Sequence, residues 1–130
     1  MRVLFVEDNP VNRLVVYQML TAGGLVMEEA ENGLVGLSKI EQNDYDLVLM
    51  DLRMPHMDGL TALRNLRART DAKARLPVIV ITADIAADVQ AECLAAGADD
   101  ILQKPISMQG LFDAIGRIFA SGRGGDTVLS

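Results

Sequence analysis

The chain has very few residues of several types, and each shortage limits what the protein can be. Its 130 residues include one cysteine and no tryptophan. A single cysteine allows no internal disulfide bond, which is typical of reducing compartments, so we expect a cytoplasmic location. No apolar run approaches the roughly 20 residues of a membrane-spanning helix. The start at Met1-Arg2 also lacks the apolar core of a signal peptide, so we expect no membrane contact.

Basic residues are outnumbered as well. Twelve Lys and Arg face eighteen Asp and Glu, which gives a formal net charge of −6. Nucleic-acid-binding proteins usually carry a basic patch or stripe, so we expect no direct nucleic-acid binding. What the chain does have is a 50% hydrophobic and 23% charged composition, typical of globular proteins, in a length that suits one domain.

Short apolar runs alternate along the chain with segments of helical period. We expect strands at Val3–Val6, Leu25–Met27, Leu47–Met50, Val78–Ile81 and Ile101–Leu102. The runs VLFV, LVLM and VIVI do not alternate with polar residues. Such runs are typical of strands that are covered on both faces of a parallel sheet.

Helix start and stop signals lie between these runs. Asn9-Pro10 reads as a cap followed by proline at the first helical position, and Gly23-Gly24 ends that helix. Asp58-Gly59 opens another helix. A further helix follows the spacing of Ile85, Val89 and Cys93 up to Gly97, with Cys93 as a small core residue. The last helix carries an apolar stripe at Leu111, Phe112, Ile115, Ile118 and Phe119.

The alternation predicts an α/β fold, a doubly wound (βα)₅ parallel sheet with right-handed connections. This domain would span residues 1–120. The remaining residues 121–130 are polar and contain glycine, and we expect them to form a flexible C-terminal tail.

Polar side chains follow four of the five expected strands. They are Glu7 and Asp8 after the first, Asp51 after the third, Thr82 at the end of the fourth, and Lys104-Pro105 after the fifth. The second strand, followed by Glu28-Glu29-Ala30, has no clear assignment. Ligands of such sheets bind beyond the carboxyl ends of the strands, so we expect these side chains to meet there. Taken singly, each is a common turn or surface residue, and Asp8 would also serve as a helix cap.

Three carboxylates at one edge of a sheet require compensation. Unit charges about 4 Å apart repel by about 4 kcal/mol at an effective dielectric constant near 20, so a pKa must rise or a cation must bind. Lys104 offsets one charge, and Mg²⁺ suits the remainder. The spacing of His56 and Cys93 does not favour zinc. A carboxylate beside Mg²⁺, a hydroxyl and a lysine is suited to accept a phosphoryl group.

Four segments resemble the receiver domains of two-component response regulators: VEDNPVN (6–12), DLVLMDLRMPHMDG (46–59), VIVITAD (78–84) and GADDILQKPI (97–106). The resemblance runs from Arg2 to about Ala120. It implies a flavodoxin-like fold with strand order 2-1-3-4-5. The opening VEDNPVN resembles receivers attached to hybrid histidine kinases, and the chain would be either such a receiver or a stand-alone regulator.

The resemblance also implies residue roles. Asp51 would accept a phosphoryl group from a histidine kinase or a histidine phosphotransfer protein. Glu7, Asp8, Asp51 and the backbone carbonyl of Arg53 would hold Mg²⁺. Thr82 would supply the switch hydroxyl and Lys104 the cation that pairs first with the acceptor and then with the phosphate. The peptide bond before Pro105 would be cis.

One position departs from the family pattern. Ile101 stands where many receivers carry Tyr or Phe, whose ring moves on activation. We hypothesise that the signal leaves through the loop after Thr82, which begins at Ala83, or through the fourth and fifth helices. A second hypothesis is that Arg53 and Asp84 form an ion pair that shields the acyl phosphate from water. Two solvated surface charges are an equally good interpretation.

Other functions are compatible with parts of the pattern. Phosphatases of the haloacid dehalogenase type also use an aspartate after an apolar strand, but they need a second Asp where this chain has Arg53. Neither GxxxxGK[ST] nor GxGxxG occurs, which disfavours a nucleotide-binding protein. A receiver-like interaction module that is never phosphorylated remains an alternative, although such modules usually lack a site residue. We therefore expect a phosphorelay receiver and not a turnover enzyme.

Overall fold

A computed structural model describes residues 1–54 and 56–120 of the chain. Five parallel strands form one sheet in the order β2-β1-β3-β4-β5, which confirms the expected strand order. The strands are β1 (Arg2–Val6), β2 (Val26–Ala30), β3 (Leu47–Asp51), β4 (Val78–Thr82) and β5 (Asp100–Gln103). The helices are α1 (Pro10–Ala22), α2 (Gly33–Gln42), α3 (Gly59–Arg67), α4 (Ala87–Ala96) and α5 (Met108–Ala120), with a 3₁₀ turn η1 (Ala72–Arg75). The tail expected at 121–130 lies outside the described residues.

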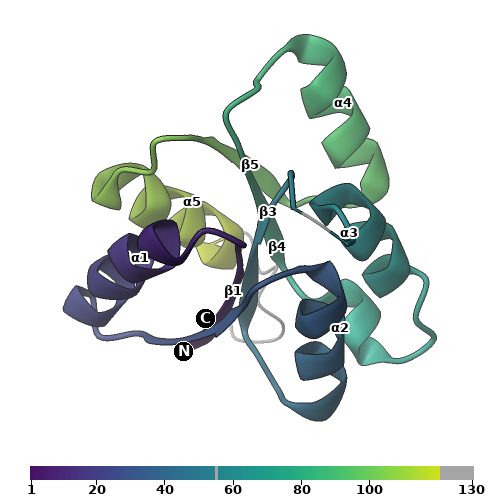
Figure 1. The fold of residues 1–130 in the computed structure, drawn as a ribbon, viewed down its shortest axis with the longest axis horizontal. Coiled ribbons are helices and arrows are strands. Elements are labelled where there is room, and N and C mark those ends of the chain that lie inside the picture. The colour runs from purple at the N-terminus through teal and green to yellow at the C-terminus, as the bar shows by residue number, and fades with distance from the viewer. Residues whose placement is uncertain (55, 121–130) are drawn as a thin grey trace.

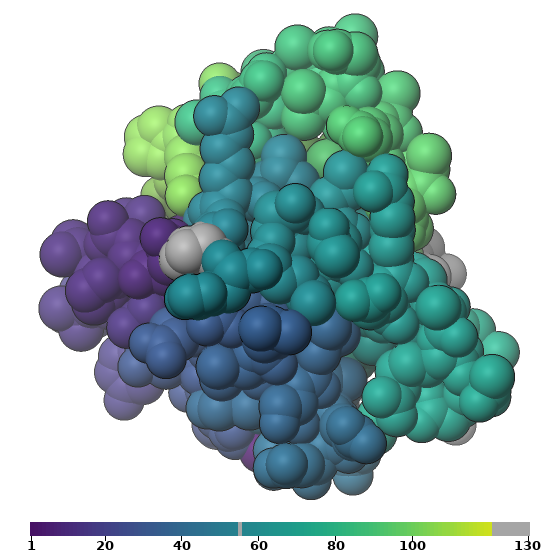
Figure 2. Space-filling view, turned by 45° about the vertical axis from the view of Figure 1, so that its right-hand side comes forward, coloured from purple at the N-terminus to yellow at the C-terminus, as the bar shows by residue number. Residues whose placement is uncertain are grey.

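Helices cover both faces of the sheet, with α1 and α5 on one face and α2, α3 and α4 on the other (Figure 1). In the space-filling view, α2 and α3 pack side by side, and α4 lies beyond α3 (Figure 2). Within the described residues, no helix has both the length and the hydropathy needed to cross a membrane.

The core lies in two layers because successive strand residues point to opposite faces. Val3 and Phe5 of β1 pack with side chains of α1 and α5, whereas Leu4 and Val6 pack with side chains of α2, α3 and α4. Every residue of β3 and β4 is buried. Burial on both faces explains the uninterrupted apolar runs of the central strands. Cys93 is buried in the second layer, as expected for a core residue.

The register aligns the carboxyl ends of the central strands. Val6 of β1 pairs with Met50 of β3, and Asp51 at the end of β3 pairs with Ile81 of β4. Glu7 therefore follows β1 at the level of Asp51, and Thr82 follows one residue later on β4. Parallel pairing thus brings three segments that are far apart in the sequence to one edge of the sheet.

Several predicted helix boundaries are confirmed. The Asn9 side chain caps α1 by accepting hydrogen bonds from the amides of Val11 and Asn12, at 2.8 and 3.2 Å. Asp58 caps α3 by accepting from the amide of Thr61 at 2.8 Å. Gly97 ends α4 with a φ of +110°, in the left-handed region that favours glycine.

Two boundaries were predicted wrongly. β2 runs from Val26 to Ala30, so the segment Glu28-Glu29-Ala30 belongs to the strand and does not follow it. β2 is an edge strand, where polar side chains can face solvent, and the search for apolar runs therefore ended too early. Ile85 lies before α4 because the Asp84 side chain accepts a hydrogen bond from the amide of Ala86 at 3.0 Å and extends the loop.

Candidate functional site

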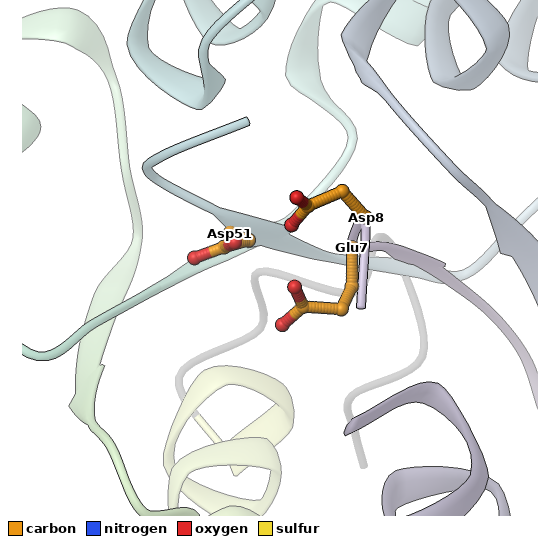
Figure 3. A group of neighbouring side chains, drawn as sticks. All are labelled: Glu7, Asp8 and Asp51. Atoms are coloured by element: carbon orange, nitrogen blue, oxygen red, sulfur yellow. The ribbon is translucent and has the colours of Figure 1, made fainter. Parts of the chain in front are cut away.

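Three carboxylates converge at the carboxyl edge of the sheet. Glu7 and Asp8 follow β1 and Asp51 ends β3, and their side chains point toward a common space (Figure 3). One carboxylate oxygen from each residue lies within 4.8 Å of the others. Glu7 and Asp51 are 1% and 3% exposed, whereas Asp8 is exposed. Asp8 does not cap α1, because Asn9 does.

Lys104 reaches this cluster from the loop after β5. Its Nζ lies 3.1 Å from Oδ1 of Asp51 and 3.3 Å from Oε1 of Glu7. The Lys104 amide donates to the Thr82 carbonyl at 2.9 Å, which fixes the start of the loop to β4. The peptide bond between Lys104 and Pro105 is cis.

The charges of the cluster are unbalanced without a further cation. Burial, followed by the neighbouring Asp51 carboxylate, raises the pKa of Glu7 to about 7. Burial disfavours the ammonium of Lys104, but its contacts with Asp51 and Glu7 outweigh burial and raise the pKa of Lys104. Three ionised carboxylates and one ammonium leave two negative charges. Oxygen ligands and this residual charge fit a hard divalent cation such as Mg²⁺, which these residues are able to hold.

A cavity of about 290 Å³ opens beside Asp51. Asp51, Arg53, Thr82, Ala83 and Asp84 line it. Thr82 is 2% exposed, and its Oγ1 accepts a hydrogen bond from the amide of Asp84 at 3.0 Å. The structure thus brings the carboxylate of β3 and the hydroxyl of β4 to one cavity, as the strand ends predicted.

The two residues singled out for tuning lie at the rim of the same cavity. Nη2 of Arg53 is 3.9 Å from Oδ2 of Asp84, and these side chains are 82% and 42% exposed. So exposed a pair contributes little to stability. Ile101 is half-buried on β5 and packs against the core layer beneath α4.

Sequence reasoning missed three residues that shape the site. Asn12 donates from Nδ2 to Oε1 of Glu7 at 3.4 Å, and Arg13 donates from Nη1 to the Glu7 carbonyl at 2.7 Å. A Cβ on Gly59 would lie 2.1 Å from the carbonyl oxygen of Asp51. Asn12 stands inside the VEDNPVN segment and Gly59 inside the DLVLMDLRMPHMDG segment, so these motifs were the available signal.

A groove adjoins the carboxylate cluster on the side of α1. Its volume is about 400 Å³, and its lining is Glu7, Asn12, Val15, Val16, Lys104, Pro105 and Ile106. Val11 and Leu14, on the same helix, are 66% and 55% exposed. Apolar side chains exposed in a group beside a reactive centre are typical of an interaction surface.

The family model of the response regulator receiver domain matches residues 3–116. A five-stranded doubly wound sheet with an acidic cluster, a threonine and a lysine at its carboxyl edge is the architecture of that class. The chain belongs to the response regulator receiver family, and it is a receiver domain of two-component phosphorelay signalling.

The chain spans most of one curated relative and only a small part of others. The two-component response regulator ORR41 of Oryza sativa subsp. japonica is 44% identical over 115 residues, which are 85% of this chain and 87% of that protein. Hybrid signal transduction histidine kinase G of Dictyostelium discoideum is 40% identical over 119 residues, 90% of this chain but 4% of the kinase. Against the sensor protein GacS of Pseudomonas syringae pv. syringae, the chain spans 13% of the relative's length.

Solved receiver structures have the same fold. The receiver domain of the sensor histidine kinase PA1611 from Pseudomonas aeruginosa PAO1 superposes with a TM-score of 0.82 at 36% identity, covering 89% of this chain and 94% of that one. That structure holds a magnesium ion in its active-site cleft. The chemotaxis protein CheY4 of Vibrio cholerae has a TM-score of 0.83 at 26% identity, with 90% and 97% coverage.

Proposed function

We propose that Asp51 accepts a phosphoryl group from a phosphohistidine in a Mg²⁺-dependent reaction. The donor is a histidine kinase or a histidine phosphotransfer protein. The observation that carries the proposal is the convergence of Asp51, Lys104 and Thr82 with two further carboxylates at one edge of the sheet. The chain would act in the cytoplasm, as a stand-alone regulator or as one domain of a longer protein that controls a partner or an attached domain.

The proposed transfer needs positioning more than covalent activation. A carboxylate oxygen of Asp51 attacks phosphorus, a P–O bond forms, and the P–N bond to the donor imidazole breaks with its electron pair returning to the ring nitrogen. Lys104 holds Oδ1 of Asp51 before transfer and would neutralise an oxygen of the phosphoryl group afterwards. The Thr82 hydroxyl would turn from the Asp84 amide to donate to another phosphoryl oxygen.

The metal ligands would be the carboxylates of Glu7, Asp8 and Asp51, together with the Arg53 carbonyl. Their oxygens are the hard donors that Mg²⁺ prefers. Bound Mg²⁺ supplies positive charge beside the transferred phosphoryl group. In its absence, Lys104 is the one cation within salt-bridge distance of both Glu7 and Asp51 in the described part of the chain.

The groove along α1 would receive the phosphodonor protein. It joins the carboxylate cluster directly, because Glu7 lines the groove and belongs to the cluster, and Lys104 lines the groove and contacts the cluster. Val15 and Ile106 give it apolar walls, and exposed Val11 extends the apolar surface along the helix. A donor that covers this groove would bring its imidazole to Asp51 while burying apolar area, which is the main source of association free energy.

Phosphorylation by acetyl phosphate with Mg²⁺, read by intact-protein mass, tests the assignment. We expect one phosphoryl adduct on the wild-type chain and none on Asp51→Asn. Asp113→Asn, an exposed aspartate on α5, is the matched control and should be phosphorylated normally. An adduct that survives Asp51→Asn would refute the role of Asp51. The absence of any adduct would favour the unphosphorylated interaction module, and continuous release of phosphate at an enzymatic rate would favour the phosphatase.

A further inference from the structure

The backbone of Glu7 is held on both sides by groups outside the regular strand pairing. Its amide donates to the Ala30 carbonyl of β2 at 2.9 Å. Its carbonyl accepts from Nη1 of Arg13 at 2.7 Å. The register between β1 and β2 ends at Val6 and Ala30, so the Glu7 carbonyl lies beyond the last strand pair. The Arg13 guanidinium therefore supplies a donor where the sheet no longer does.

This carbonyl belongs to the peptide unit between Glu7 and Asp8, the two acidic residues of the candidate magnesium site. A peptide unit is planar, so fixing the direction of its carbonyl fixes the orientation of the whole unit. The directions in which the two carboxylates leave the backbone depend on that orientation. A hydrogen bond to this one carbonyl thus acts on both side chains. Among the described residues, Arg13 forms no hydrogen bond or ion pair with either carboxylate.

Arg13 is itself anchored. Its side chain is 15% exposed, and its Nε lies 3.3 Å from Oε1 of Glu29 on β2. Nε is fully buried and, in the described structure, has no hydrogen-bond partner besides this ion pair, so the Glu29 charge is what compensates it. Lys39 of α2 donates to the Glu29 carbonyl at 2.7 Å and fixes the strand at the same residue. A short charge-assisted bond such as that from Arg13 to Glu7 is stronger than a neutral one.

We propose that Arg13 is a positioning residue for the magnesium site. It orients the peptide unit between Glu7 and Asp8, and Glu29 orients Arg13. This inference rests on the proposed binding of Mg²⁺ by these two acids, and it assigns to α1 a role in the affinity for the metal. Loss of the Arg13 hydrogen bond should weaken Mg²⁺ binding by the folded protein, because the two carboxylates would then sample several orientations.

Calorimetric titration of the metal-free chain with Mg²⁺ alone, at pH 8, measures this effect. The variants are Arg13→Met, which removes the donor, and Arg13→Lys, which keeps one donor for the Glu7 carbonyl. Arg64→Met is the control, because Arg64 is an exposed arginine on α3 whose ion-pair partner is Glu92 at 3.7 Å. We expect Arg13→Met to raise the dissociation constant for Mg²⁺ about tenfold, as for other groups that orient metal ligands. The dissociation constants of Arg13→Lys and Arg64→Met should stay within about threefold of the wild-type value.

The outcomes distinguish the positioning role of Arg13 from the proposed Mg²⁺ binding on which it rests. Urea unfolding without metal tests whether each variant is folded. If Arg13→Met is not folded, Arg13→Lys is compared with wild type and with Glu29→Gln. In that comparison Glu29→Gln should bind Mg²⁺ more weakly than Arg13→Lys. Arg13→Met or Glu29→Gln binding Mg²⁺ as tightly as wild type would overturn the positioning role and leave the magnesium site intact. A wild-type chain that does not bind Mg²⁺ would overturn both.

Discussion

Gly59→Ala should damage the end of β3 that carries Asp51. Gly59 is the first residue of α3, and its amide donates to the Leu52 carbonyl at 2.9 Å. A Cβ at this position would lie 2.1 Å from the Asp51 carbonyl oxygen and 3.0 Å from the Cα of Leu52. The first distance is more than an ångström short of ordinary contact, and the obstacle is backbone that cannot rotate away. The start of α3 and the end of β3 must therefore separate.

The size of the effect follows from three contributions. Overpacking costs about 1–3 kcal/mol of folding free energy. Stretching the Gly59–Leu52 hydrogen bond costs about 1 kcal/mol more. The better helix propensity of alanine returns at most about 1 kcal/mol, since the residue stands at a helix end. We expect a net loss of about 1–4 kcal/mol, which a domain with about 5–15 kcal/mol of stability survives.

Urea unfolding followed by circular dichroism measures this loss, and a Mg²⁺ titration of the folded variant should show weaker binding because Asp51 has moved. The matched control is Gly116→Ala in α5, where a Cβ would meet nothing within 4 Å. There the same substitution should be neutral or stabilise the protein by up to about 1 kcal/mol. If Gly59→Ala proved as stable as Gly116→Ala and bound Mg²⁺ normally, the steric reasoning would be refuted.

Four further predictions concern the site. The pKa of Glu7 is raised to about 7, so a proton on this carboxylate competes with the metal. The apparent Mg²⁺ affinity measured by calorimetry should therefore fall about tenfold from pH 8 to pH 6. An affinity that does not change with pH would contradict this. The same raised pKa means that the metal-free fold should lose stability to urea as pH rises from 4.5 through 7, since the unfolded state releases this proton first. Arg53→Ala should shorten the lifetime of phosphorylated protein, measured by loss of the phosphoryl adduct, if the pair with Asp84 shields the acyl phosphate; an unchanged rate would count against shielding. Structures with and without a phosphoryl mimic should show Ile101 in one rotamer and movement in the loop after Thr82, whereas a large rotamer change at Ile101 would contradict this route.

The fold could be predicted because its central strands are buried on both faces. β1, β3 and β4 appear in the sequence as apolar runs, and parallel pairing then requires their carboxyl ends to lie together. The polar residues that follow them, such as Glu7 and Asp51, were therefore predicted to meet before any contact was known. β2 was placed less well because two glutamates, Glu28 half-buried and Glu29 exposed, interrupt its apolar pattern, so that its composition did not distinguish it from a loop.

Contacts made through the backbone were beyond the reach of sequence reasoning. Arg13 acts on a carbonyl, and every residue has a carbonyl, so nothing in the sequence marks its partner. Gly59 was read correctly as a helix start, but its close approach to Asp51 depends on the angle at which α3 meets β3. A pair between Arg53 and Asp84 was one of two interpretations that the sequence left open, because each follows a site residue by two positions after adjacent strands; their side chains lie 3.9 Å apart.

The charge balance of the cluster connects these observations. In the metal-free protein Lys104 contacts both Glu7 and Asp51. Burial first, and the Asp51 carboxylate second, raise the pKa of Glu7 to about 7 despite that ammonium. A divalent cation would replace the proton on Glu7, and Lys104 would then no longer need to compensate both carboxylates. The proposed transfer of a phosphoryl group would then add negative charge at Asp51, beside the cavity that Thr82 also lines. Thr82 supplies the hydroxyl in that lining, and its oxygen accepts from the Asp84 amide. If Thr82 turns toward the phosphoryl group, as we propose, this hydrogen bond to the loop would be lost. In this proposal the added charge would change backbone hydrogen bonding before α4, without requiring any movement of Ile101.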